Sequence, residues 1–159
     1  MKSLRTEWRR WEALDDASNV VESQNGGDSM ADIVVICRDG MVNSYISSLI
    51  AAIETKKAGG DVAVIFTQEA LVALAERKFR LAPLLEGYKS KIEENAKKLG
   101  LAADPVALVK AAKDAGVRLI ACPAWVGLTE IKVPAELETP DVAEVLRIIG
   151  EAKKVIGTF

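Results

Sequence analysis

The sequence predicts an α/β protein: a single three-layer α/β/α domain on a mostly parallel sheet of four or five strands, preceded by an N-terminal helical arm. Continuous β-branched runs recur along the chain, which is typical of strands covered on both faces. Segments with apolar residues at helical spacing lie between these runs. This alternation favours right-handed βαβ units. The 159 residues suffice for one domain with its own core.

The N-terminal segment differs in composition from the rest. We expect residues 1–29 to be an extension and residues 30–159 to be the α/β domain. Apolar side chains at helical spacing predict a short amphipathic helix, with Leu4, Trp8, Trp11 and Leu14 on one face. Residues 23–29 have the composition of a linker. Either this is an upstream extension with Met30 as an alternative start, or it is an arm whose tryptophans dock on the domain or on a neighbouring subunit. The arm is favoured, because two tryptophans on one face are costly to leave in water.

The first half of the domain has clear element signals. The run 32–37 is a predicted buried strand, and the periodicity from Val42 predicts a helix that ends at Gly59 and Gly60. A second buried strand is expected over 61–66, and a helix over 68–76.

The second half continues the alternation. We expect a helix over about 85–99, then a helix that begins at Asp104 and Pro105, an N-cap residue followed by proline at the first helical position. The remaining expected elements are a strand over 117–122, a short helix through Trp125 to Ile131, a final helix that begins after 139–141, and a last strand over 154–159.

Composition excludes several classes of function. The net charge is −2 with both signs interspersed, so no basic face favours nucleic-acid binding. No apolar stretch approaches the roughly 20 residues of a membrane span, and the charged N-terminus lacks the apolar core of a secretory signal. The chain has no histidine, which excludes Ser–His–Asp and Cys–His mechanisms, and two cysteines alone cannot build a four-ligand zinc site. We expect no metal, no cofactor and a reducing, cytoplasmic location.

Chemistry in an open parallel sheet is expected at the carboxyl ends of its strands. Both cysteines fall there, and Cys122 is the better catalytic candidate. It lies where a buried strand turns into a predicted helix, whose N-terminal N–H groups favour a thiolate. The other interpretation is a small buried apolar residue, because free cysteine is often buried. Cys37 is either a second thiol that resolves or accepts sulfur, or strand packing, and packing is favoured.

Other residues at this edge are weaker candidates for an accessory or pocket role. Arg38, Gly40 and Asn43 belong to the first βα-loop, which could bind an anion or be an ordinary polar turn; it lacks P-loop and dinucleotide glycine spacing. Gln68 could contact a ligand or simply begin a helix. Trp125 could wall a pocket, lie in a subunit interface or pack in the core.

Four segments together resemble the DsrE/DsrF-like family, which includes the TusD-type sulfur-relay subunits. They are 33–53, 62–71, the strand 116–122 with the short helix after it, and the closing segment 152–159. The resemblance covers about residues 31–159. It implies a parallel sheet flanked by helices, assembly into homo-oligomers such as trimers or hexamers, and a cysteine at the position of Cys122 that accepts a persulfide and hands it to a partner. The residues Pro-Ala-Trp-Val-Gly-Leu that follow this cysteine depart from the pattern of the well-characterised relay subunits.

The leading hypothesis is therefore a sulfurtransferase or sulfur carrier with donor and acceptor protein partners and Cys122 as the reacting residue. The alternatives are a non-catalytic oligomeric binding or scaffold module of the same fold, and a protein with a small-molecule or nucleotide pocket near Gly40 and Gln68.

Overall fold

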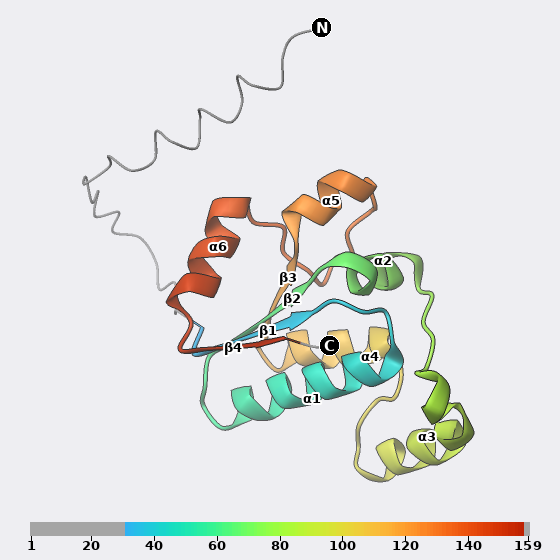
Figure 1. Cartoon of the computed structure of the whole chain (residues 1–159). Helices are drawn as coiled ribbons and strands as arrows, with labels where there is room; N and C mark the ends of the chain where they lie inside the picture. Colours follow the sequence, from blue (N-terminus) through green and yellow to red (C-terminus); the bar gives the residue numbers. More distant parts are fainter. Residues whose placement is uncertain (1–30, 158–159) are drawn as a thin grey trace, which may run out of the picture.

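One four-stranded sheet forms the centre of the protein, which we describe from a computed structural model over residues 31–157 (Figure 1). All strands are parallel, and their order is β3-β2-β1-β4. The strands are β1 (Ile33–Cys37), β2 (Val62–Phe66), β3 (Arg118–Ala121) and β4 (Lys154–Gly157). The expected parallel α/β fold is confirmed, with four strands in the described part of the chain.

The helices follow the expected order along the chain. They are α1 (Val42–Lys57), α2 (Gln68–Glu76), the 3₁₀ segment η4 (Pro83–Tyr88), α3 (Lys89–Lys98), α4 (Pro105–Asp114), α5 (Pro123–Thr129) and α6 (Val142–Glu151). One expectation needs correction: the helix over 85–99 is divided into η4 and α3. Gly87 disfavours a continuous α-helix there, and neither piece buries a side chain that would hold it against the domain.

The two faces of the sheet carry different helices (Figure 1). The larger core cluster includes Val35 of β1, Leu49 of α1 and Leu108 of α4, so α1 and α4 lie on one face. On the other face Val145 and Ile148 of α6 pack against the sheet. The chain steps from β1 to β2 to β3 in one direction and then returns to β4. A right-handed crossover in the reverse direction must pass over the opposite face, which places α6 there.

Aspartate side chains cap two helices, and the cap at Asp104 was expected from the sequence. The Asp104 carboxylate accepts a hydrogen bond from the Ala107 N–H at 2.8 Å, and the Asp141 carboxylate accepts one from the Glu144 N–H at 2.8 Å. Each such cap is worth about 1 kcal/mol, because it satisfies an N–H group that has no partner within the helix.

The free edge of β3 is covered by the segment that leads to α6. The Ala121 N–H donates to the Glu138 carbonyl, and the Glu138 N–H donates to the Leu119 carbonyl, both at 2.8 Å. This pairing brings the chain back beside the strand before it crosses to the α6 side.

Two expectations fall outside the described residues: the amphipathic helix and linker of residues 1–29, and the end of the last strand at residues 158–159. Among residues 31–157, no helix has the length and apolar character to cross a bilayer.

Candidate functional site

The carboxyl edge of the sheet brings together the ends of β1, β2 and β3. The Thr67 N–H donates to the Cys37 carbonyl at 3.0 Å, and the Cys122 N–H donates to the Phe66 carbonyl at 2.9 Å. After β2 the chain turns to the α1 side, whereas after β3 it proceeds to α6 on the opposite side. In open α/β sheets, ligands bind where the connections part in this way. The carboxyl ends of β2 and β3 are therefore the expected position of a functional site.

Cys122 occupies the junction between β3 and α5. It is the N-cap residue of α5, with extended backbone angles (φ −62°, ψ 115°), and its carbonyl accepts the Val126 N–H at 3.0 Å. Pro123 at the first helical position has no N–H to leave without a partner. The Cys122 side chain is partly buried and packs against the α6-side core, so part of it remains open to solvent.

Cys37 lies on the other face of the sheet. Cys37 pairs in register with Phe66, and Phe66 with Ala121, so these side chains share the α1 side. Cys122 is the next residue after Ala121 and points the opposite way, because successive strand residues alternate. Cys37 is fully buried, and neither cysteine forms a disulfide. The structure therefore places the two thiols on opposite faces.

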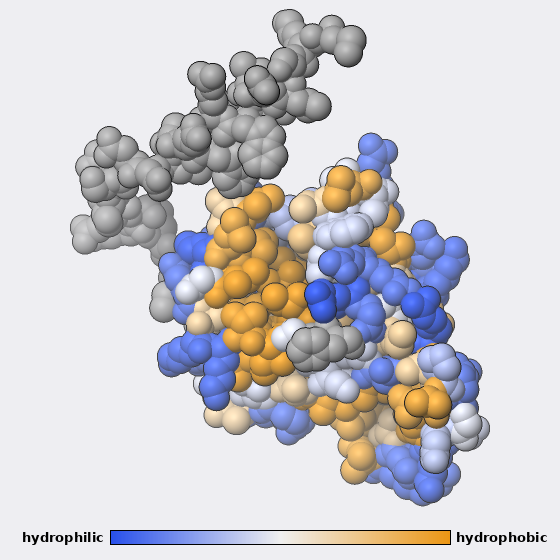
Figure 2. Space-filling view, in the orientation of Figure 1, coloured by the Kyte–Doolittle hydropathy of each residue, from blue (hydrophilic) through white to orange (hydrophobic). Residues whose placement is uncertain are grey.

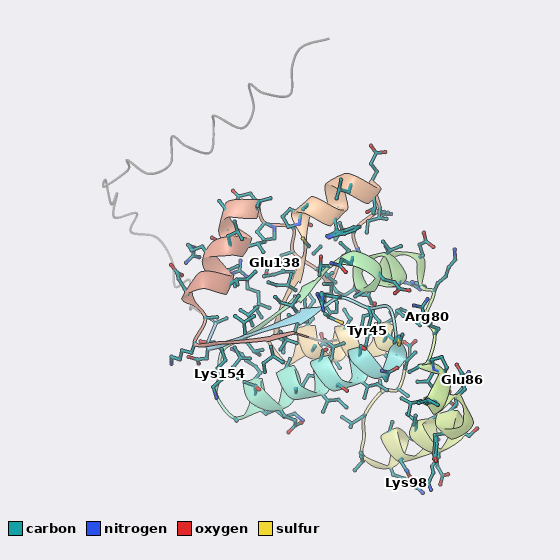
Figure 3. The ribbon with its side chains drawn as sticks, in the orientation of Figure 1. Tyr45, Arg80, Glu86, Lys98, Glu138 and Lys154 are labelled. Atoms are coloured by element: carbon teal, nitrogen blue, oxygen red, sulfur yellow. The ribbon has the colours of Figure 1, made fainter. Side chains whose placement is uncertain are left out.

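Tyr45 of α1 connects this helix to α2 near the edge (Figure 3). Its hydroxyl donates to the Ala70 carbonyl at 2.5 Å, and its ring packs on those of Phe66 and Phe79. Burial raises the pKa of Tyr45 far above its usual value, and the negative charges of neighbouring acidic groups add to this. The phenol therefore stays protonated and donates. The helical periodicity that begins at Val42 includes Tyr45 as an apolar position, and nothing in that pattern indicates a partner for its hydroxyl.

The first βα-loop makes contacts that hold the fold together. The Asn43 side-chain oxygen accepts the Ala82 N–H at 3.1 Å and so fixes the chain before η4. Gly40 is buried against α2: a Cβ there would lie 2.9 Å from the Cβ of Ala73. Arg38 is exposed, and its carbonyl accepts the Ala70 N–H at 2.9 Å. These contacts favour the ordinary structural interpretation of Gly40 and Asn43.

The backbone of Gln68, at this edge, has a positive φ angle. It is exposed at the start of α2 with φ 51°, a left-handed conformation that costs a residue with a side chain on the order of 1 kcal/mol. It follows the end of β2. This strand pairs with β3, and the carbonyl of its last residue, Phe66, accepts the Cys122 N–H. Strain of this kind is concentrated at functional sites, so Gln68 is a candidate for contact with whatever approaches Cys122.

Trp125 anchors α5 to the domain. Its partly buried ring packs against the α1-side core, and its carbonyl accepts the Thr129 hydroxyl at 2.5 Å. The side chain therefore contributes to packing on the face away from Cys122.

Two hollows in the described part of the surface have linings that do not include Cys122. One of about 510 Å³ is lined by Gly40, Glu69 and Arg80 among others, and an ion pair of 2.7 Å joins the last two. Another of about 570 Å³ lies between the start of α1 and α3 and includes Phe79 and Lys89 in its lining. Within residues 31–157 no three histidine, cysteine, aspartate or glutamate side chains gather as a metal site would require.

The fold is shared with a solved structure. The ychN protein from E. coli, a DsrE/DsrF-like protein, matches 81% of this chain over 100% of its own length, with a TM-score of 0.54 and 17% sequence identity. At this identity the likeness establishes the fold, and the resemblance drawn from the sequence is confirmed at that level. No model of a protein family matches the sequence, and no curated protein matches it.

Proposed function

We propose, from this shared fold and from the position of Cys122, that the protein accepts sulfur as a persulfide on Cys122 and passes it to a cysteine of a partner protein. The observation that carries the proposal is the partial exposure of Cys122 at the carboxyl edge of the sheet. Cys37 lacks that access, because it is fully buried on the opposite face. The proposal therefore involves a single thiol and requires no second cysteine of the same chain.

The chemistry is an exchange at sulfur. The Cys122 thiolate attacks the outer sulfur of a donor persulfide, a new S–S bond forms on Cys122, and the donor S–S bond breaks to release the donor thiolate. A thiolate of the acceptor then attacks the outer sulfur on Cys122, and the Cys122 thiolate leaves. Each step forms one S–S bond and breaks one, so no oxidant, metal or cofactor is consumed.

The surroundings of Cys122 suit a transient carrier. Cys122 packs against apolar side chains of the α6-side core, which would shield a persulfide from water on one side. The residue is only partly buried, which leaves room for the approach of a partner's thiol. The strained, exposed Gln68 follows the neighbouring strand β2. We infer that the donor or acceptor chain contacts this residue as it approaches. Reduced thiols are needed throughout, which fits the cytoplasmic location expected from the sequence.

Intact mass spectrometry tests the proposal. The wild type, Cys122→Ser and Cys37→Ala are incubated with an active cysteine desulfurase and cysteine, without reductant. We expect wild type and Cys37→Ala to gain one sulfur and Cys122→Ser to gain none, with thermal unfolding recorded to show that each variant is folded. Equal gain on Cys122→Ser would refute the role of Cys122. Absence of gain on every variant, also with a small-molecule persulfide as donor, would refute sulfur loading.

A non-catalytic binding or scaffold role of the same fold is the second candidate, because large apolar side chains are exposed. Leu84 in η4 is 91% exposed and Leu99 after α3 is 73% exposed. Such side chains favour association with other chains. From the fold shared with a DsrE/DsrF-like protein we infer that copies of this protein assemble, as trimers or hexamers. Light scattering coupled to gel filtration measures the assembly, and a monomer at micromolar concentration would contradict it.

A further inference from the structure

Thr67 and Cys122 lie side by side at the carboxyl edge of the sheet. Phe66 at the end of β2 pairs in register with Ala121 at the end of β3. The next residues along these two strands are Thr67 and Cys122. Thr67 keeps an extended backbone (φ −139°, ψ 167°), and its N–H donates to the Cys37 carbonyl, which continues the strand pairing. Neighbouring strands are about 4.8 Å apart, so the two side chains are close neighbours.

Both side chains lie on the α6 side of the sheet. Successive strand residues alternate between the two faces, and Phe66 belongs to the α1-side core, so the Thr67 side chain is on the opposite side. Cys122 packs against the α6-side core. The hydroxyl of Thr67 and the thiol of Cys122 therefore share one face and one step of the sheet.

The α6 side is mainly apolar and only partly covered. Ile36, Ile65 and Ile120 lie in register across β1, β2 and β3 on this side, and Ile36 is only partly buried. Figure 2 shows the continuous apolar area over α6 and the adjoining sheet. Thr67 places a hydroxyl one step beyond this apolar row, beside Cys122. A hydroxyl buried in such surroundings carries a cost in free energy unless it makes a hydrogen bond.

The hydroxyl of Thr67 is not used by the fold. The residue is only 8% exposed. A threonine that precedes a helix normally accepts a hydrogen bond from an N–H of the first turn. The Thr67 side chain makes no such bond to α2, and the Ala70 N–H donates to the Arg38 carbonyl at 2.9 Å instead. Among residues 31–157 the Thr67 hydroxyl has no hydrogen-bond partner.

Two threonines within helices show the usual arrangement. The hydroxyls of Thr55 and Thr129 each donate to the carbonyl four residues earlier in the same helix. Thr67 stands before the first residue of α2, so no helical carbonyl precedes it at that distance. A buried hydroxyl without a partner, beside a partly exposed thiol, indicates that its partner belongs to a bound group.

A persulfide on Cys122 supplies such a partner. Its outer sulfur lies one S–S bond, about 2.05 Å, beyond the Cys122 Sγ. That distance is a large part of the spacing between the two strands, so the outer sulfur can come within hydrogen-bond reach of the Thr67 hydroxyl. When the outer sulfur is ionised it is a charged acceptor, and hydrogen bonds to charged groups are roughly twice as strong as those between neutral groups.

We propose that the Thr67 hydroxyl donates a hydrogen bond to the outer sulfur of the persulfide on Cys122 and assists its transfer. This inference rests on the function proposed above. In the transfer step the acceptor thiolate attacks the outer sulfur, one S–S bond forms, and the electron pair of the broken S–S bond leaves on Cys122. The outer sulfur keeps its negative charge, which repels the incoming thiolate. The hydrogen bond from Thr67 disperses that charge and lowers the repulsion.

Chemically loaded protein tests the transfer step. An aromatic disulfide first converts Cys122 to a mixed disulfide, and hydrosulfide then displaces the aromatic thiolate and leaves a persulfide. Transfer to a cysteine peptide is followed by the gain of sulfur on the peptide, measured by mass. We expect Thr67→Val to transfer about tenfold more slowly than the wild type, because a hydrogen bond to a charged group is worth a factor of this order. Thr67→Ser keeps the hydroxyl and should restore the rate.

The matched control is Thr55→Val in α1, on the other face of the sheet, which makes the same chemical change and should leave the transfer rate unaltered. An unchanged rate in Thr67→Val, or a loss in Thr67→Ser equal to that in Thr67→Val, would overturn the proposal.

Two measurements on the unloaded protein separate this role from a structural one. Thr67→Val replaces a hydroxyl without a partner by a methyl group of similar shape, so the variant should melt at or above the wild-type temperature. Alkylation of the resting Cys122 thiol should keep its wild-type rate, because the hydroxyl acts on the outer sulfur. A lower melting temperature would reveal a structural partner, and slower alkylation would place the effect on the thiol itself. Either result would overturn the proposal.

The two proposals fail in different ways. Chemical loading needs no donor protein, so the effect of Thr67→Val on transfer is measured whether or not a desulfurase loads Cys122. Absence of loading by every persulfide donor would refute sulfur acceptance as the function. Normal loading with an unchanged transfer rate in Thr67→Val would refute only the hydrogen bond from Thr67.

Discussion

Replacement of Gly40 by alanine tests the packing of the first βα-loop against α2. The added Cβ would lie 2.9 Å from the Ala73 Cβ and 3.1 Å from the Glu69 Cγ. Comfortable carbon–carbon contacts lie at about 3.5–4.0 Å, so loop and helix must separate by about half an ångström. The φ of Gly40 lies outside the left-handed region, which leaves this contact as the main cost.

We expect Gly40→Ala to lower the free energy of unfolding by about 1–2 kcal/mol. Overpacking of a well-packed site costs roughly 1–3 kcal/mol. Part of this is offset by about 0.4–1 kcal/mol, because alanine restricts the unfolded chain more than glycine does. Urea unfolding followed by circular dichroism measures the difference.

The control is Gly150→Ala in α6, where an added Cβ meets nothing within 4 Å. It should stabilise the protein by about 0.5–1 kcal/mol, because alanine is the better helix former. Adding Ala73→Gly to Gly40→Ala removes the closest contact, so the double variant should lose less stability than the two single changes combined. If Gly40→Ala were as stable as Gly150→Ala, the close packing of this loop would be refuted.

Three further predictions concern single side chains. Tyr45→Phe should lower the free energy of unfolding by about 0.5–1.5 kcal/mol in urea titrations, because it removes the hydrogen bond from this buried hydroxyl to the Ala70 carbonyl; no loss would contradict a contribution of that hydrogen bond. Cys37 should react with a thiol reagent only after unfolding, as followed by peptide mass, and fast labelling of the native protein would contradict its burial. The hydrogen bond from Arg147 lowers the pKa of Glu144 below its ordinary value of 4.5, so the stability that this carboxylate contributes is present above pH 4.5 and is lost as the pH falls through the lower value in the folded protein. The melting temperatures of the wild type and Glu144→Gln should therefore differ at neutral pH and converge in acid, and a constant difference would refute this linkage.

Matched controls separate these effects from general destabilisation. Tyr88 is 58% exposed, so Tyr88→Phe should leave stability within about 0.5 kcal/mol of the wild type. Labelling of Cys122 in the same sample as Cys37 provides an internal standard, because only Cys122 is partly open to solvent.

The order and type of the elements follow from local signals in the sequence. The β-branched runs that became β1 and β2 and the capping residues Asp104 and Asp141 act within a few positions of themselves, so they can be read without knowledge of the fold. The divided segment 83–98 was the exception. Its apolar residues follow a helical period, but the domain buries none of its side chains, and that is a property of tertiary structure.

The position of Cys122 at a strand end was also readable, whereas the face on which each cysteine lies was not. A strand buried on both faces has no alternation of apolar and polar residues, so its sequence does not tell which side chains point to which helix layer. Only the register of β1, β2 and β3 places Cys37 on the α1 side and Cys122 on the α6 side. The close approach of Gly40 to Ala73 and the partial cover of the α6 side likewise depend on how distant segments pack. The sequence by itself thus determined the fold class and the candidate thiol, because both rest on patterns along the chain. The surroundings of that thiol were decided by tertiary structure, because they depend on the pairing and packing of segments far apart in sequence.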